Sequence, residues 1–185
     1  MIKYRKGMFE TNSSSTHSIC ISKEKIDTDK LAGQYIHFGF GEWGWEVDTV
    51  YNTADYLYTA ILGNPSADIV DRRLDKLKAI LDKYYINYSF EPVVEDNGRY
   101  YPKETEYYGI DHGNECCDFV EAVLDNEDML LNWLFGDSFV ETGNDNGCER
   151  DAACFCAFEE FFENGTFVPN PRYNEDKYTY FFKGN

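Results

Sequence analysis

Residues 9–22 read FETNSSSTHSICIS, a polar run that passes directly into a strand. Nine of its first ten side chains can donate or accept a hydrogen bond. Over Thr16–Ser22 the residues alternate, with Ile19 and Ile21 on one face, which predicts a β-strand. A polar run this dense forms either a solvent-exposed loop or a binding surface, and both interpretations stay open.

Outward from this stretch, the sequence predicts an α+β fold, in which a mixed or antiparallel sheet packs against four to five helices. Apolar residues at helical spacing and capping residues at the ends predict the helices. These helices span 52–62, 66–85, 115–124, 127–135 and 151–164. Runs of alternating or β-branched and aromatic residues predict further strands. These strands span 2–5, 34–40, 87–94, 105–110, 138–141 and 177–183.

The first and last of these helices depend on particular signals. Asn52 or Thr53 is expected to cap the first helix, because short polar side chains accept hydrogen bonds from the first turn. The last helix rests on phenylalanines at helical spacing and on Gly165 as its C-terminal cap. These phenylalanines are Phe155, Phe158, Phe161 and Phe162.

The chain has 185 residues, of which 43% are hydrophobic and 17% aromatic, which is typical of a folded protein. We expect a single domain over 1–185, or two lobes divided near residue 90. No stretch has the pattern of a signal peptide, and no apolar run reaches the length of a membrane span. The sequence therefore predicts a cytoplasmic protein.

The negative charge is concentrated in the second half of the chain. Residues 1–90 carry 12 Asp and Glu against 11 Lys and Arg, whereas residues 91–185 carry 22 against 6. Nearly all of the formal net charge of −17 therefore belongs to residues 91–185. Such a field repels nucleic acids and membrane surfaces and attracts basic proteins. The alternative is that the charge only keeps the protein soluble.

Carboxylates in the acidic half are candidates for contact with a basic partner. Asp118, Glu121 and Asp125 are spaced i, i+3 and i+7, which places them on one face of the third predicted helix. Duplex DNA carries a phosphate charge about every 1.7 Å of its axis, and rows of carboxylates on rigid elements can imitate it. The other candidates are Asp111, Glu115, Glu127, Asp128, Asp145, Glu149 and Asp151.

An aromatic loop follows the strand predicted at 34–40. Residues 39–46 read GFGEWGWE, with three glycines between large rings. Rings outside a regular element either cover a core or contact a partner. Trp43 and Trp45 are therefore candidate apolar anchors of an interface, with core packing as the alternative.

The polar run also allows a different class of function, an enzyme acting on a nucleotide or a phosphorylated substrate. Hydroxyls and backbone N–H groups can cradle a phosphate, and His17 could exchange protons with Glu10 as its partner. The site would comprise Glu10, Asn12, Ser13, Ser14, Ser15 and His17. No nucleophile elbow or Gly-rich phosphate loop accompanies them, and a hydrogen-bonded turn has the same composition.

The six cysteines are expected to be reduced thiols. Their spacing contains no CxxC pair, although there are enough ligands for zinc. We therefore predict no metal and no cofactor. The residues concerned are Cys116, Cys117, Cys148, Cys154, Cys156 and His112.

Residues 5–18, RKGMFETNSSSTHS, resemble the opening of a group of small proteins from phages and mobile elements of Firmicutes, and residues 41–45, GEWGW, are similar to a segment of that group. Small acidic proteins of such elements often act against host defences, among them anti-CRISPR inhibitors of type II nucleases. These nucleases hold nucleic acid in positively charged channels. The resemblance implies an anti-defence protein of the bacterial cytoplasm that binds a basic partner, such as a type II CRISPR nuclease with its guide RNA. A structural phage component that forms homo-oligomers is a further interpretation.

Overall fold

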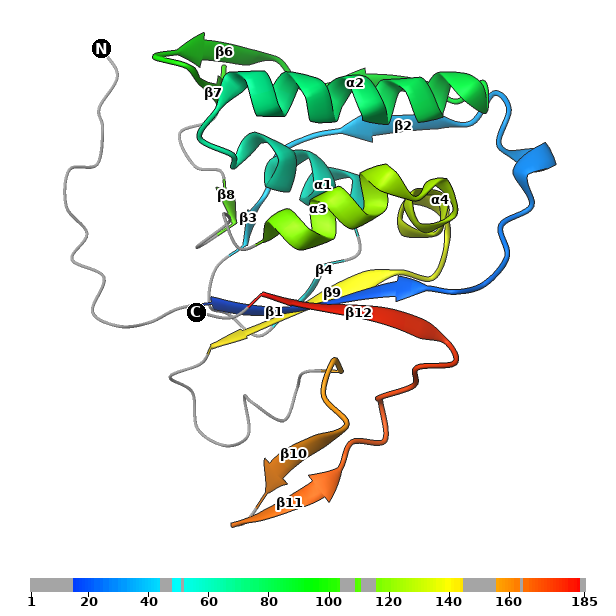
Figure 1. Ribbon diagram of the computed structural model, residues 1–185, viewed down its shortest axis with the longest axis vertical. Coiled ribbons are helices and arrows are strands. Elements are labelled where there is room, and N and C mark those ends of the chain that lie inside the picture. Colours follow the sequence, from blue (N-terminus) through cyan, green and yellow to red (C-terminus); the bar gives the residue numbers. More distant parts are fainter. Residues whose placement is uncertain are drawn as a thin grey trace.

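The computed structural model describes residues 15–43, 48–50, 52–103, 109–110, 116–144, 156–163 and 165–183. A four-stranded sheet lies across the middle of the molecule, with the helices on one face and a small hairpin beyond the other (Figure 1). Its strand order is β12-β1-β9-β4, and all neighbouring strands are antiparallel. The predicted α+β class is confirmed.

The strand that begins in the polar run is an inner strand of this sheet. β1 (Ser15–Ser22) pairs with β9 (Phe139–Asn144) on one side and with β12 (Tyr178–Lys183) on the other. Ile19 and Ile21 are each 1% exposed and join the hydrophobic core, as their alternation predicts. β4 (Asp48–Val50) completes the sheet, so strands from both halves of the chain build it.

Four α-helices cover one face of the sheet. α1 (Thr53–Leu62) runs through the core, and the Asn52 side chain accepts a hydrogen bond from the backbone N–H of Asp55, which confirms the predicted cap. α2 (Ala67–Lys83) lies on the outside, where it packs against α1 and α3. α3 (Cys117–Asp125) and α4 (Glu127–Phe135) meet at Asn126, whose side chain caps α4.

The remaining strands form two-stranded sheets. β2 (Tyr35–Phe38) pairs in parallel with β5 (Asn87–Phe90), and β3 (Glu42–Trp43) pairs in parallel with β8 (Gly109–Ile110). β6 (Val93–Asp96) and β7 (Arg99–Pro102) form a hairpin around Asn97-Gly98, where both residues have positive φ. A short 3₁₀ helix, η1 (Thr28–Lys30), follows β1.

The helix predicted over 151–164 is wrong for its described part. β10 (Glu160–Glu163) pairs with β11 (Thr166–Pro169), so the described residues contain four α-helices rather than five. Gly165 has a φ of 82° and forms the turn of this hairpin instead of ending a helix. Phenylalanines fit strands as well as helices, and the β-branched Thr166 and Val168 on the far side of the turn favour pairing.

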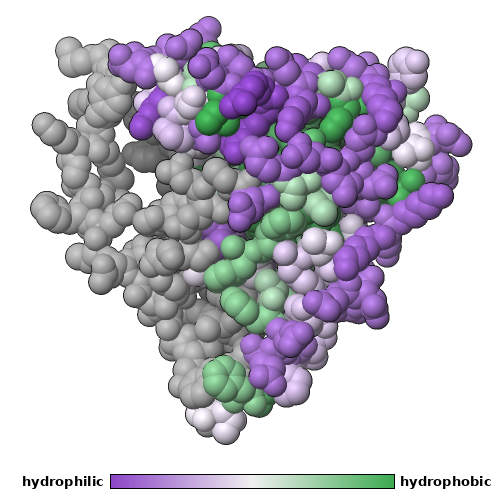
Figure 2. All heavy atoms as spheres, viewed as in Figure 1, coloured by the Kyte–Doolittle hydropathy of each residue, from purple (hydrophilic) through white to green (hydrophobic). Residues whose placement is uncertain are grey.

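Hydrophilic residues cover α2 on the face shown in Figure 2, and hydrophobic residues appear lower, around β12 and the β10–β11 hairpin. Phe158, Phe167 and Phe182 are among the exposed large hydrophobic residues, and the rings of Phe158 and Phe182 lie 4.8 Å apart. In the described part of the chain, no helix is both long and apolar enough to cross a membrane.

Candidate functional site

The predicted acidic row of α3 lies against basic residues of α2. Arg73 is only 5% exposed, and its Nε and Nη2 lie 2.8 and 2.7 Å from Glu121 Oε1. Lys76 Nζ lies 2.5 Å from Asp125 Oδ1 and 3.8 Å from Glu121 Oε2. Two of the three carboxylates in the row therefore hold α2 against α3.

Glu127 of α4 makes a similar contact with the end of α2. Its carboxylate accepts hydrogen bonds from Lys83 Nζ and, at 3.0 Å, from the Tyr84 hydroxyl. The bonds from Lys83 and Tyr84 lower the pKa of Glu127, because they favour its charged form. The sequence pattern did not predict these ion pairs, which α2 forms through the exposed Lys76 and Lys83 and the buried Arg73.

Other carboxylates of the acidic half remain unpaired. Asp118 and Asp128 are exposed, and neither forms an ion pair within the described ranges. The same holds for Glu159 and Glu160, which lie at the β10 end of the hairpin. We call these four carboxylates the open carboxylates; Asp118 and Asp128 were predicted as contact residues, and Glu159 and Glu160 add to them.

Several candidates lie outside the described residues. They are Asp111, Glu115, Asp145, Glu149, Asp151 and Trp45. Trp43 is described only through its backbone, which pairs with Ile110 between β3 and β8. The polar-run candidates Glu10, Asn12, Ser13 and Ser14 also lie outside, and Ser15 is described only as the first residue of β1.

His17 lies in the core and not at a surface. It is 0% exposed, and its Nδ1 lies 2.7 Å from the hydroxyl oxygen of Tyr56, which in turn lies 3.7 Å from Cys116 Sγ. Tyr56 and Cys116 are also buried, and Lys183, the strand neighbour of His17 in β12, is 1% exposed. Burial, together with the positive charge of Lys183, lowers the pKa of His17 to about 3. His17 is therefore neutral near pH 7.

Three polar side-chain atoms at His17 and its two neighbours in β1 lack hydrogen-bond partners among the described residues. These atoms are Thr16 Oγ1, His17 Nε2 and Ser18 Oγ, which are buried and form no hydrogen bond with the described part of the chain. Their side chains alternate between the two faces of β1, so they do not converge on one point. The last residues of the polar run, Thr16, His17 and Ser18, are therefore buried residues of β1.

The cysteines whose side chains are described are buried, and none of them forms a disulfide within the described residues. They are Cys20, Cys116 and Cys156. A hydrogen bond to Cys156 and burial raise the pKa of the Cys20 thiol, which therefore stays protonated. Within the described ranges, no group of three His, Cys, Asp or Glu side chains is arranged to hold a metal ion.

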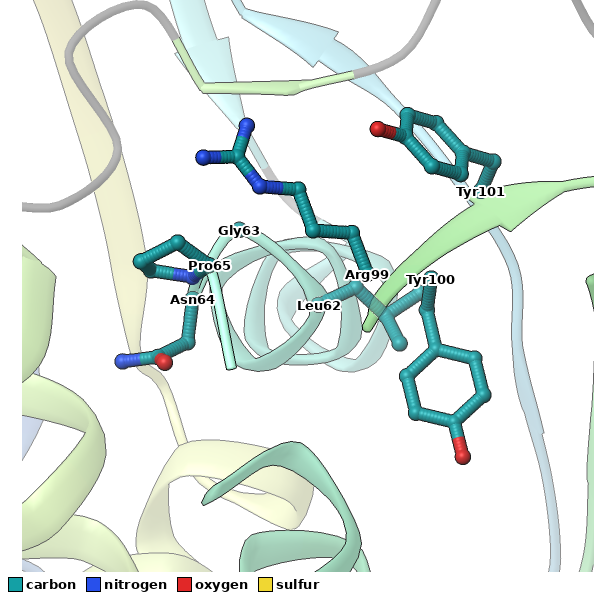
Figure 3. Close-up of a pocket in the computed structure, with 7 residues that line it drawn as sticks. All are labelled: Leu62, Gly63, Asn64, Pro65, Arg99, Tyr100 and Tyr101. Carbon is teal, nitrogen blue, oxygen red and sulfur yellow. The ribbon is translucent and has the colours of Figure 1, made fainter. Parts of the chain in front are cut away.

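The hollows on the described surface include a small pocket and a larger cleft. The small pocket, of about 150 Å³, lies where α1 ends, and Arg99 extends over the turn at 63–65 beside it (Figure 3). The Tyr100 side chain points away from Arg99, and its hydroxyl donates a hydrogen bond to Asp71. A larger cleft of about 480 Å³ lies between residues 23–28, Tyr84 and α4. Asp128, one of the open carboxylates, lines this cleft.

The ion pair between α2 and α3 leads to a stability prediction. Replacing Glu121 with glutamine should lower the free energy of unfolding by roughly 1–2 kcal/mol, because the buried Arg73 loses its charged partner. A larger loss of unfolding free energy is not expected, because the Glu121 side chain is 46% exposed and water screens its charge. Urea unfolding measures the loss, and Asp118→Asn is the matched control on the same helix. Equal losses for the two variants would contradict this role of Glu121.

No protein-family model, no curated protein and no solved structure matches the chain.

Proposed function

We propose that this protein is a non-catalytic binding protein that docks on a basic, nucleic-acid-handling protein of a bacterial host and competes with the nucleic acid for its channel. A type II CRISPR nuclease with its guide RNA is a partner of this kind, since it holds the heteroduplex in a positively charged channel. The resemblance of residues 5–18 to openings of phage and mobile-element proteins supports this choice.

The proposal rests on the contacts and burial of the few Lys and Arg side chains in the acidic half of the chain. Residues 91–185 contain six Lys and Arg. Arg172 binds Glu141 at 2.6 Å, Lys177 binds Asp137 at 3.0 Å, and Lys183 is buried. These three cations are thus unavailable to the open carboxylates. The outer surface keeps a negative field that a basic partner can neutralise.

Such a field acts chiefly on the rate and selectivity of association. Complementary potentials steer encounter and raise association rates, and salt screens them over about 8 Å at physiological ionic strength. Binding should therefore weaken steeply as salt is added. Because nucleic acid is also negatively charged, the same field opposes direct binding of the nucleic acid by this protein.

The alternative is an enzyme that acts on a nucleotide or phosphorylated substrate through the Glu10–His17 stretch. A general acid or base must reach its substrate and works best with a pKa near the working pH. His17 is buried, and its pKa is about 3. These properties weigh against the alternative.

Neutralising the open carboxylates should weaken partner binding at least tenfold at low salt. The variant combines Asp118→Asn, Asp128→Asn, Glu159→Gln and Glu160→Gln. The first readout is retention of the variant by a guide-loaded type II nuclease at low and at high salt. The second is inhibition of DNA cleavage by that nuclease. The control combines Asp29→Asn, Asp68→Asn, Asp75→Asn and Asp82→Asn, which changes the net charge equally but in the first half of the chain.

We expect the control to bind like the unmodified protein. Equal weakening by the two quadruple variants would mean that net charge alone matters and would contradict a defined surface. Absence of both retention and inhibition in the unmodified protein would overturn the proposed partner class.

A further inference from the structure

The β10–β11 hairpin projects from the side of the sheet that faces away from the helices, and its base is fixed to the sheet (Figure 1). Asn170 is buried, and its Nδ2 donates to the Phe158 carbonyl oxygen at 2.7 Å. Its backbone N–H donates to the Glu159 carbonyl oxygen, also at 2.7 Å. Two residues later, Arg172 forms an ion pair of 2.6 Å with the buried Glu141 of β9. The hairpin is therefore held in a defined position at its base.

The two faces of the hairpin differ in exposure. Val168 is half-buried, whereas Phe167, which lies on the opposite face, is 70% exposed. Pro169 shares the face of Phe167, and Glu160 is the cross-strand partner of Pro169, so Glu160 lies on this face as well. Glu160 is exposed and forms no ion pair with the described residues. The exposed face of the hairpin thus combines an aromatic ring with a free carboxylate.

Two further exposed phenylalanines lie at the base of the hairpin. Phe158 is 38% exposed and Phe182 is 45% exposed, and their ring centroids lie 4.8 Å apart. Together with Phe167 they are half of the six large hydrophobic residues that are exposed in the described part of the chain. Hydrophobic residues accordingly gather around β12 and the hairpin in Figure 2. Exposed apolar surface with a polar rim is typical of a protein–protein contact site.

The charges beside these rings favour one kind of partner. Glu159 and Glu160 are open carboxylates, and Arg172, which follows β11, is already paired with Glu141. A second copy of the chain would bring the same carboxylates toward their own copies, and each chain carries a formal net charge of −17. Like charges across an interface oppose association, whereas a positively charged surface attracts these carboxylates. Charge complementarity therefore selects a basic protein over self-association.

We propose that the β10–β11 hairpin is a docking element whose Phe167 ring enters an apolar pocket rimmed by Lys and Arg on the basic partner. The identity of the partner rests on the proposed function, and the hairpin adds the chemistry of the surface that it recognises. Aromatic residues surrounded by polar groups contribute much of the binding energy at interfaces. Glu159 and Glu160 meet the cations of the rim, and the ring adds an apolar contact that salt does not screen.

The test compares inhibition of DNA cleavage by a guide-loaded type II nuclease at low and at moderate salt. Phe167→Thr removes the ring but keeps a residue that favours strands, and it should raise the half-inhibiting concentration roughly tenfold or more. This factor should be the same at both salt concentrations, because the lost contact is apolar. Phe167→Leu, which keeps an apolar side chain, should lose less. Tyr35→Thr, at another exposed ring in a strand, is the matched control and should inhibit like the unmodified protein.

Two further measurements separate docking from folding and from self-association. Phe167→Thr should unfold at the same urea concentration as the unmodified protein, because the ring is mostly exposed. Sedimentation should show that the unmodified protein is a monomer. A dimer that Phe167→Thr dissociates would assign the hairpin to self-association and overturn the docking element.

The cleavage assay also distinguishes failure of the docking element from failure of the proposed function. If the unmodified protein inhibits the nuclease and Phe167→Thr inhibits equally well, the docking element fails and the proposed function stands. Equal losses for Phe167→Thr and Tyr35→Thr would likewise overturn the docking element alone. If the unmodified protein is neither retained by the nuclease nor inhibitory, the proposed function fails, and the docking element fails with it.

Discussion

The Trp133→Ala substitution is expected to lower the free energy of unfolding by about 3–5 kcal/mol, because it empties the centre of the helical layer. Trp133 is 0% exposed, and its ring centroid lies 4.7 Å from that of Phe119 and 6.0 Å from that of Tyr56. Its Nε1 donates to the Thr53 carbonyl oxygen at 2.8 Å. One side chain therefore joins α4 to α3 and α1 by both packing and a buried hydrogen bond.

Urea unfolding at neutral pH measures this loss. Trp133→Phe keeps an aromatic ring but removes the N–H donor and should cost less than the alanine variant. Tyr35→Ala, at a position that is 64% exposed, should change stability by less than about 1 kcal/mol. A loss for Trp133→Ala as small as that for Tyr35→Ala would contradict the central place of Trp133 in the core.

Local sequence patterns predicted the elements with strong periodicity and clear ends. The span of α4 was predicted as observed, and the predicted second helix overlaps α2, whose apolar stripe includes the buried Val70, Leu77 and Leu81. The sequence predicts a helix over 151–164 because its phenylalanines have helical spacing and Gly165 can cap its end, but residues 160–163 form a strand. What decides between the two is pairing with β11 across Gly165, a contact that spacing alone does not encode.

The candidate site shows the same division. Spacing predicted that Asp118, Glu121 and Asp125 share a helix face. Whether each of them forms an ion pair, however, depends on the neighbouring helix, α2. Glu121 and Asp125 face Arg73 and Lys76, whereas Asp118 lies beyond their reach and stays unpaired. The cleft at Asp128 could not be predicted, because it arises where the segment after β1 approaches α4, about a hundred residues later in the chain.

Acid is expected to destabilise the protein through His17. Its pKa is about 3 in the folded state and near 6.5 when the chain is unfolded. The unfolded state therefore binds a proton first, so the stability contributed by neutral His17 is complete above about pH 6.5 and falls as pH approaches 3. Between pH 7 and pH 5 this one group should cost about 2 kcal/mol.

Comparison of two variants isolates this contribution from the carboxylates that titrate in the same range. His17→Gln removes the titrating group, so the stability difference between the unmodified protein and this variant should shrink or reverse by about 2 kcal/mol from pH 7 to pH 5. His37→Gln, which replaces an exposed histidine, leaves His17 in place and should keep the acid dependence of the unmodified protein. Urea unfolding at pH 7, 6 and 5 measures all three. Parallel pH profiles for the unmodified protein and His17→Gln would show that the folded and unfolded states protonate His17 alike, which the burial of its ring and the adjacent Lys183 charge oppose.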